Sequence, residues 1–310
     1  MKLHTTTDYH LFDLKTLGWE LTVCNALTPT QSPCRSILKD NASYGSLLYD
    51  FMNRLCNLEK DLHVLEIGGG YGYLMRDFLN RNPSLRVTML DISPYLLSRQ
   101  QETLHGYDIN FRREDFLDTR MESLGKVDLV IMNENLGDFP TVVDISPDVL
   151  YNSPSGSDDA LLAEVMRCVA GYNLDIPPQP SYHFNLGAIQ AIEKLCVAHI
   201  PTIFLSEHSC EAHPPNMFPS FSLFGVPGSP ERIVLKGHEE YTIQFSHLEK
   251  IAAAYRYHII RGPLVDIIPL VMTDRLHCCL AAPAARTDQD EVIRHFVADL
   301  YKYEYLLLTR

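Results

Sequence analysis

The sequence predicts an α/β fold in which an open, mostly parallel β-sheet carries helices on both faces. Between about residues 44 and 135, apolar runs of strand length alternate with amphipathic segments of helix length, and this alternation is typical of such a sheet. The chain has 310 residues, of which 46% are hydrophobic and 21% are charged. This length and composition allow one large core or two modest ones.

The first half of the chain supplies the elements of this sheet in the order expected for βαβ units. Ser93 followed by Pro94 is a typical helix start, because serine caps a helix and proline suits its first turn. The pattern predicts helices at 44–58, 73–81 and 94–104 and strands at 63–67, 86–92, 109–113 and 127–133.

After Pro140 the regular alternation stops, and loops rich in Pro, Ser, Asn and Asp predict an insertion. Helices are expected within it at 160–172 and 186–198, and we expect the insertion to roof over the carboxyl edge of the sheet. The predicted division is an N-terminal extension at 1–43, a cofactor-binding half at 44–140, an inserted substrate cap at 141–199, and the remaining sheet at 200–310.

The last third of the chain returns to sheet-forming segments. Ser246 with Glu249 three residues later predicts a capped helix start. Strands are expected at 201–207 and 303–310, and a strand or hairpin at 231–245.

Composition excludes several classes of protein. A net charge of −13 disfavours a nucleic-acid-binding surface, and neither a signal peptide nor an apolar run of about 18 residues is present. We therefore expect a cytoplasmic protein that binds no membrane, with reduced cysteines. His208, Cys210 and His213 lie close together but lack an evident fourth ligand, so no metal site is predicted. The sequence does not indicate the oligomeric state.

The glycine-rich stretch "VLEIGGGYGYLMRDFL" at 64–79 is the strongest functional signal, because a glycine turn from strand to helix lets a ligand approach the backbone. It is not a dinucleotide fingerprint, since Tyr73 stands where the third glycine would be, and it lacks the Lys-Ser/Thr ending of a P-loop. What remains is an acidic residue followed by alternating glycines, Glu66, Gly68, Gly70 and Gly72.

This pattern resembles the first motif of class I S-adenosylmethionine-dependent methyltransferases. The resemblance implies a Rossmann-like sheet with an antiparallel terminal strand, S-adenosylmethionine as cofactor and S-adenosylhomocysteine as product. Glu66 then serves the methionine ammonium, Asp91 at the end of the next strand accepts from the ribose hydroxyls, and Asp115 accepts from the adenine amino group. Asn133, at the end of the fourth strand, faces the methionine end.

The segments "LDISPYLLSRQQETL" and "NENLGDFP" look like the MidA-like methyltransferases, a family that includes the mitochondrial protein-arginine methyltransferase assisting complex I assembly. The chain departs from that family in the glycine loop, where Gly69 and Tyr71 replace proline and arginine. It also departs at Gly137, which replaces an acidic residue that is followed here by Asp138.

Three classes of function remain open, and two of them differ in the methyl acceptor, which is a protein or a small molecule. The chain methylates a protein side chain such as arginine, or a small molecule under the insertion, or it is a cofactor-binding assembly factor without chemistry. Glu134 and Asp138 are the catalytic candidates that can orient a guanidinium and accept its proton. His183 is a candidate base in the insertion, where Tyr182 and Asn185 flank it; Glu207 and His208 follow the fifth strand, and Tyr71 and Tyr73 can line the pocket.

Overall fold

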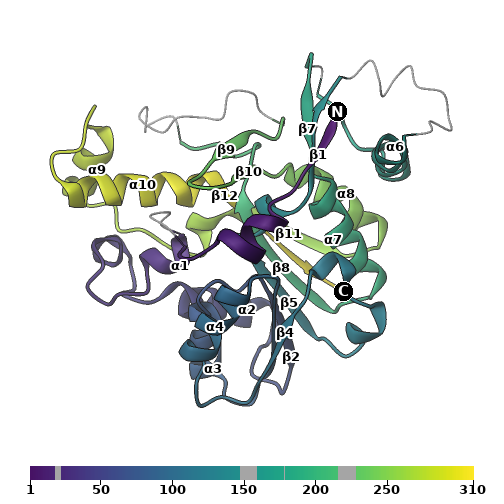
Figure 1. The fold of residues 1–310 in the computed structure, drawn as a ribbon. Coiled ribbons are helices and arrows are strands. Elements are labelled where there is room, and N and C mark those ends of the chain that lie inside the picture. The colour runs from purple at the N-terminus through teal and green to yellow at the C-terminus, as the bar shows by residue number, and fades with distance from the viewer. Residues whose placement is uncertain (18–21, 147–158, 178, 216–227) are drawn as a thin grey trace.

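The computed structural model describes residues 1–17, 22–146, 159–177, 179–215 and 228–310. Its centre is a seven-stranded sheet in the order β11-β12-β8-β5-β2-β3-β4 (Figure 1). All neighbouring strands are parallel except that β12 runs antiparallel to both β8 and β11. The strands are β2 (His63–Ile67), β3 (Arg86–Asp91), β4 (Ile109–Arg113), β5 (Leu129–Asn133), β8 (Thr202–His208), β11 (His258–Pro263) and β12 (Tyr303–Thr309). The mostly parallel α/β sheet predicted from the sequence, with its antiparallel terminal strand, is therefore confirmed.

Helices cover both faces of the sheet, so both faces of each central strand are buried. In β5, Leu129 and Ile131 join one hydrophobic core with α2, α3 and α10, whereas Val130 and Met132 join a second core with α6, α7 and α8. This alternation follows from the two-residue period of a strand. The helices are α1 (Val23–Ala26), α2 (Tyr44–Cys56), α3 (Tyr73–Arg81), α4 (Pro94–Thr103), α6 (Ala160–Tyr172), α7 (Leu186–Val197), α8 (Phe245–Ala254), α9 (Asp274–Ala281) and α10 (Asp288–Lys302).

Two small antiparallel units lie beyond the main sheet. β1 (Lys2–His4), β6 (Thr141–Ile145) and β7 (Tyr182–Phe184) form a three-stranded sheet, in which Leu3 pairs with Val142. β9 (Arg232–Val234) and β10 (Glu239–Tyr241) form a hairpin. In Figure 1 the purple N-terminal segment passes from β1 across the middle of the molecule to α1. The segment includes a π-helix, η1 (Tyr9–Asp13).

The region 141–199, expected to cap the site, contributes more than a cap. It supplies β6, β7 and α6, and also α7, whose residues are part of the core that lies directly on the main sheet. β6 begins immediately after Pro140, where the sequence pattern predicted loss of regular structure. Its partners lie about 40 and 140 positions away along the chain, so no local pattern marks it as a strand.

The sequence predicted serine caps at the starts of two helices, and the structure has one of them. The Ser93 hydroxyl accepts a hydrogen bond from the Leu96 amide, which confirms the predicted cap of α4. The cap predicted at Ser246 is wrong, because α8 begins one residue earlier, at Phe245. The Ser246 hydroxyl instead donates to a carboxylate oxygen of Glu211 at 2.5 Å, a tertiary contact that competes with the local cap.

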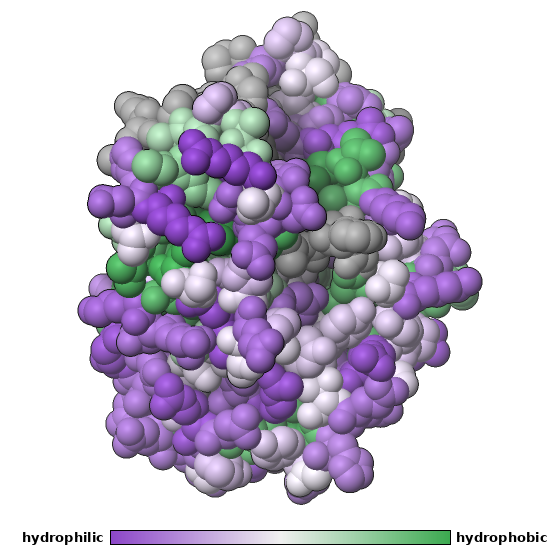
Figure 2. Space-filling model, turned by 90° about the vertical axis from the view of Figure 1, so that its left-hand side faces the viewer, coloured by the Kyte–Doolittle hydropathy of each residue, from purple (hydrophilic) through white to green (hydrophobic). Residues whose placement is uncertain are grey.

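The surface is mixed in polarity. The face shown in Figure 2 is mostly hydrophilic, and its larger hydrophobic areas gather in the upper half of the view. Among the described residues, no helix combines the length and the apolar composition needed to cross a bilayer.

Candidate functional site

A pocket lies at the carboxyl ends of β2, β3 and β5, the place where open α/β sheets bind ligands. We call it the glycine-loop pocket. It encloses about 1090 Å³ of space not filled by atoms, part of which is open to solvent. It is lined by residues 66–71, 73–74, 90–92, 96, 114–116, 133–135 and 138–140 of the sheet domain, together with 6–7, 10, 17, 22 and 24–25 of the N-terminal segment.

The glycine loop forms one wall of this pocket and needs its glycines for two reasons. Gly68, Gly70 and Gly72 have φ angles of +64°, +54° and +79°, a region that strains any residue with a side chain. A Cβ at Gly68 would also lie 2.5 Å from Nδ2 of Asn135. Gly72 does not line the pocket but occupies the N-cap position of α3. At Gly68 and Gly70 the loop therefore brings backbone, rather than side chains, up to the cavity.

Glu66 is a buried acid beside this loop, with 2% of its surface exposed. Burial, followed by the nearby Asp91 carboxylate, raises its pKa to about 8. Its Oε2 atom is buried and makes no hydrogen bond to the described residues. A buried acid with an unmatched oxygen in a ligand pocket is suited to a cationic group, which would satisfy the oxygen and stabilise the ionised form.

Asp91 is held in a fixed position at the end of β3. It accepts hydrogen bonds from the Ser93 amide at 2.9 Å and from Nε2 of Gln100 at 2.8 Å. Gln100 also donates to the carbonyl of Gly70 at 3.1 Å, so one side chain ties the acid to the glycine loop. Burial raises the pKa of Asp91 to about 6, although these hydrogen bonds oppose the rise. A carboxylate held on both oxygens still has lone pairs for two further donors.

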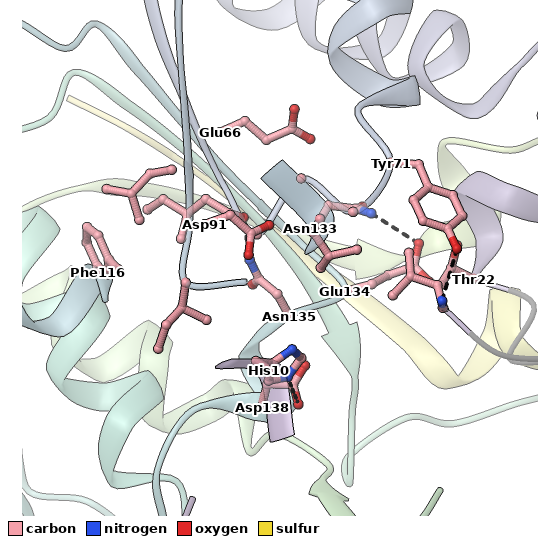
Figure 3. Close-up of a pocket in the computed structure, with 18 of the residues that line it drawn as sticks. His10, Thr22, Glu66, Tyr71, Asp91, Phe116, Asn133, Glu134, Asn135 and Asp138 are labelled. Atoms are coloured by element: carbon pink, nitrogen blue, oxygen red, sulfur yellow. Dashed lines mark hydrogen bonds and ion pairs between the residues drawn. The ribbon is translucent and has the colours of Figure 1, made fainter. Parts of the chain in front are cut away.

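The far end of the pocket contains Asp115 and Phe116. Asp115 caps a 3₁₀ turn, η3 (Phe116–Asp118), by accepting from the Leu117 amide at 2.9 Å. The Phe116 ring is buried, and both residues line the pocket. In the view of Figure 3, Asp91 and Phe116 lie toward one end of the pocket, while Glu134 lies toward the other. The sequence reading predicted Asp115 but not its aromatic neighbour.

Asn133 and Glu134 end β5 at the opposite side. Asn133 is held by three hydrogen bonds: its oxygen accepts from the hydroxyls of Tyr44 at 2.6 Å and Ser206 at 2.7 Å, and its amide donates to Glu134 at 3.1 Å. Glu134 has a φ of +54°, which is uncommon for a residue with a side chain and occurs often at functional sites. Asn133 therefore positions Glu134 and also lines the pocket, where its role toward the cofactor stays a prediction.

The Glu134 carboxylate also holds the N-terminal segment. It accepts from the amide of Val23 at 3.0 Å and from that of Cys24 at 3.4 Å, the first residues of α1. Burial raises the pKa of Glu134 to about 7, although these amides and Asn133 lower it in part. At neutral pH both its protonated and its ionised form are populated.

A second cavity adjoins the first, which we call the acidic pocket. The two share His10, Leu17, Thr22, Glu134 and Asp138. None of the described residues that line the acidic pocket is Lys or Arg, and five are carboxylic acids: Glu134, Asp138, Glu207, Glu240 and Asp299.

Glu207 is the most buried of these acids, with 3% of its surface exposed. It accepts from the amides of Gly137 at 3.1 Å and His208 at 2.8 Å, and burial raises its pKa to about 8. Gly137, which departs from the MidA-like pattern, therefore supplies a backbone donor to this acid.

The structure does not bring every predicted residue to these pockets. His183 lies on β7, where its Nδ1 accepts from the Asp144 amide at 3.3 Å, and it lines neither pocket. Asn185 bonds the backbone of Thr242 and Gln244. Elsewhere, within the part of the chain that the structure describes, His208, Cys210 and His213 do not gather into a metal-ligating group.

Sequence reasoning missed the N-terminal wall of the site. Leu17 donates its amide to the Tyr71 hydroxyl at 3.0 Å, and His10 lies 2.9 Å from Asp138 (Nε2 to Oδ1). These residues carry no recognisable motif, and their partners are 54 and 128 positions away. Tyr71 and Tyr73, considered as pocket residues, both line the pocket.

Comparison with known proteins agrees with this geometry. A model of a methyltransferase domain matches residues 65–149, and no curated protein matches the chain. The fold is similar to that of an uncharacterized superfamily protein from Burkholderia thailandensis, with a TM-score of 0.54 and 12% identity over 98% of this chain and 86% of that one. A magnesium protoporphyrin IX methyltransferase from Synechocystis is also similar, with a TM-score of 0.42 and 13% identity over 86% and 80% of the two chains.

At these sequence identities the similarity of the Burkholderia structure concerns the fold alone. The TM-score of the Synechocystis structure is below 0.5, and no conclusion is based on it. The domain match covers the glycine loop, Asp91, Asp115 and the Asn133–Glu134 pair. Together, the matched domain and the class I sheet order support an S-adenosylmethionine-dependent methyltransferase.

Proposed function

We propose that the chain transfers a methyl group from S-adenosylmethionine to a basic nitrogen of an acceptor that enters the acidic pocket. One observation carries this proposal: the glycine-loop pocket and a pocket lined by five carboxylic acids adjoin at Glu134 and Asp138. A pocket with this charge favours a cationic or hydrogen-bond-donating group, such as a guanidinium or an amine.

The cofactor fits the first pocket through its own chemistry. Glu66 receives the methionine ammonium, which stabilises the ionised form of a carboxylic acid that burial otherwise keeps protonated. Asp91 accepts from the ribose hydroxyls, Asp115 accepts from the adenine amino group, and Phe116 packs on the adenine ring. The backbone at Gly68 and Gly70 borders the ribose and the methionine chain. Glu134, at the end of β5, would then border the methyl-donating end of the cofactor.

The reaction is an in-line displacement. The nitrogen lone pair forms the new bond to the methyl carbon while the carbon–sulfur bond breaks, and its electron pair stays on sulfur. The protein must hold the nitrogen roughly 3–3.5 Å from that carbon. The methylated nitrogen then carries a surplus proton, which Glu134 accepts.

Glu134 suits the role of general base because its pKa of about 7 lies near the working pH. Only its ionised form can accept the proton, so the rate should rise with pH up to about 7 and then level. Asn133, Tyr44 and Ser206 act as positioning residues for this acid, since Asn133 on β5 bonds it and is itself held by Tyr44 of α2 and Ser206 of β8. Asp138 borders both pockets and can orient the acceptor.

The acceptor is a protein arginine in the first instance, because the motifs "LDISPYLLSRQQETL" and "NENLGDFP" resemble the MidA-like methyltransferases. A small basic metabolite is the second candidate. It is favoured by the N-terminal segment and the β9–β10 hairpin, whose residues His10, Leu17, Ile233 and Leu235 form part of the wall of the acidic pocket. The third candidate function is a cofactor-binding assembly factor that catalyses no reaction.

Transfer of a radiolabelled methyl group separates these candidates. The protein is incubated with labelled S-adenosylmethionine and either a proteome extract, with peptide mapping of labelled arginine, or a metabolite extract. Label in protein arginine supports the first candidate and label in a basic metabolite supports the second. Label in neither, from a protein that binds S-adenosylhomocysteine, refutes both.

Glu134→Gln tests the catalytic assignment. We expect it to bind S-adenosylhomocysteine within a few-fold of wild type and to lose the rise of turnover with pH below 7. A variant that keeps wild-type turnover and its pH profile would remove Glu134 from the mechanism. His183→Ala is the control, because His183 lines neither pocket. Asn135→Asp would not serve as a control, because Asn135 contacts the glycine loop.

A further inference from the structure

Three side chains from distant parts of the chain meet where the two pockets join. They are His10 on η1, Asp138 on the 3₁₀ turn η5 (Leu136–Asp138), and His238 in the turn between β9 and β10. One ligand atom from each lies within 4.8 Å of the others. Figure 3 shows His10 and Asp138 side by side at the edge of the glycine-loop pocket.

The distances within this group suit a small cation. Nε2 of His10 lies 2.9 Å from Oδ1 of Asp138, and Nε2 of His238 lies 3.7 Å from the same oxygen. Neighbouring ligand atoms around a tetrahedral zinc ion lie roughly 3.3 Å apart, given zinc–ligand bonds of about 2.0–2.1 Å. The observed separations bracket that value, so small side-chain rotations would place all three atoms on one ion.

The chemistry of the ligands favours zinc over magnesium or calcium. Two imidazole nitrogens and a carboxylate oxygen are typical ligands of zinc and of neighbouring transition metals, whereas magnesium and calcium prefer oxygen alone. Glu240 brings a second carboxylate: its Oε1 lies 2.9 Å from Nε2 of His238. Two carboxylates with two neutral imidazoles balance the charge of a divalent ion.

The surrounding residues hold these ligands in place. The Tyr9 ring stacks on the His238 ring, with a centroid distance of 4.1 Å and an interplanar angle of 14°. Gly237 has a φ of +102°, and a Cβ there would lie 2.9 Å from the Tyr9 ring, so the stack depends on glycine. The Thr6 hydroxyl donates to the Asp138 carbonyl at 2.8 Å. Supporting contacts of this kind orient metal ligands in proteins.

We propose that His10, Asp138 and His238 bind one zinc ion, with Glu240 supplying a second negative charge beside His238, and that the ion fastens the N-terminal segment and the β9–β10 hairpin to the carboxyl end of the sheet. The ion closes the roof over both pockets and takes up charge of Asp138 and Glu240. Glu134, Glu207, Asp299 and the second carboxylate oxygen of Asp138 remain for the acceptor. Zinc binding itself does not depend on the proposed methyl transfer; only its effect on ligand access rests on the proposed function.

Calorimetry on protein without an affinity tag tests the site. Chelator-treated wild type is titrated with zinc chloride and, separately, with magnesium chloride. We expect one zinc ion per chain and no magnesium binding. Loss of a residue that only hydrogen-bonds to a metal ligand typically weakens metal binding roughly 10- to 100-fold. His10→Ala and His238→Ala, which remove ligands themselves, should each weaken zinc binding by more than that. Zinc should also raise Tm of wild type but of neither variant.

His208→Ala is the matched control. His208 lines the same acidic pocket near Glu207 and Asp299 but lies outside the proposed ligand set, so its zinc affinity should equal that of wild type. Zinc binding lost in His208→Ala but kept in His10→Ala would place the ion elsewhere and overturn the proposal. A folded wild type that binds no zinc would overturn it too.

S-adenosylhomocysteine titrations with and without zinc separate this proposal from the proposed function. Tighter cofactor binding with zinc in wild type, and no such gain in His238→Ala, supports the closing role. Zinc binding without any change in cofactor affinity refutes that role but leaves the metal site and the methyltransferase assignment standing. Zinc binding by a chain that binds no S-adenosylhomocysteine refutes the proposed function alone.

Discussion

Binding of S-adenosylhomocysteine at pH 7 should release close to one proton, most of it from Glu66. With a pKa of about 8, Glu66 in the free protein is protonated in about nine molecules of ten at pH 7. The ligand ammonium favours the ionised form and lowers this pKa, so the proton leaves as the ligand enters. Lowering the pH from 7 to 6 should therefore weaken binding about tenfold, or about 1.4 kcal/mol.

Isothermal titration in buffers of different ionisation enthalpy measures this release. At pH 7 the observed binding enthalpy, plotted against the buffer ionisation enthalpy, should have a slope corresponding to about 0.9 proton from Glu66. In Glu66→Gln that contribution should vanish, and the affinity should change little between pH 6 and 7. Asp91, with a pKa of about 6, adds only about 0.1 proton at pH 7.

A wild-type slope near zero would refute the assignment of Glu66 to the ammonium. An unchanged slope in Glu66→Gln would refute it as well, because the proton would then come from another acid, with Glu134 the next to test.

Three further predictions concern affinity and stability. Gly68→Ala should cost about 1–3 kcal/mol of stability and weaken cofactor binding, because its φ is +64° and Asn135 lies in the way; Gly171→Ala, a helical glycine with open space around it, should be neutral or stabilising in the same denaturant titrations. Asp91→Ala should weaken S-adenosylhomocysteine binding about 100-fold by calorimetry, through loss of two charged hydrogen bonds to ribose; unchanged affinity would contradict the ribose assignment. Because folding raises the pKa of Glu66 from 4.5 to about 8, the folded chain binds the extra proton between these values, so the free energy of unfolding should fall as pH rises through this window, by up to about 1.4 kcal/mol per unit. Thermal scans of Glu66→Gln should show a smaller fall.

Much of the fold could be predicted because its signals are local. The predicted strand at 63–67 and helix at 73–81 coincide with β2 and α3, since a buried run, a glycine turn and an amphipathic period lie within 20 residues. The same locality marked Asp91, which ends β3, and Asp115, which lies two residues after β4, as candidates at the carboxyl edge of the sheet.

The rest of the site could not be predicted because it depends on distant contacts. His10 and Thr22 border the pocket only because β1 pairs with β6 and α1 meets Glu134, and neither contact leaves a periodic trace in the sequence. His183 illustrates the same dependence: histidine chemistry suggested a base, yet on β7 this residue accepts a hydrogen bond from the Asp144 amide and lines neither pocket.

The pairing of β1 with β6 also has a consequence for the order of folding. It joins residues about 140 positions apart, whereas β2 and β3 join residues about 23 apart. By loop-closure entropy, the longer connection costs about 1.6 kcal/mol more to close. The main sheet should therefore assemble first and the N-terminal wall of the pocket last. Until that wall has folded, the ligand can reach Glu66 from the open side of the pocket. Late folding and ligand capture would then be one kinetic event, and the refolding rate of the last phase should depend on ligand concentration.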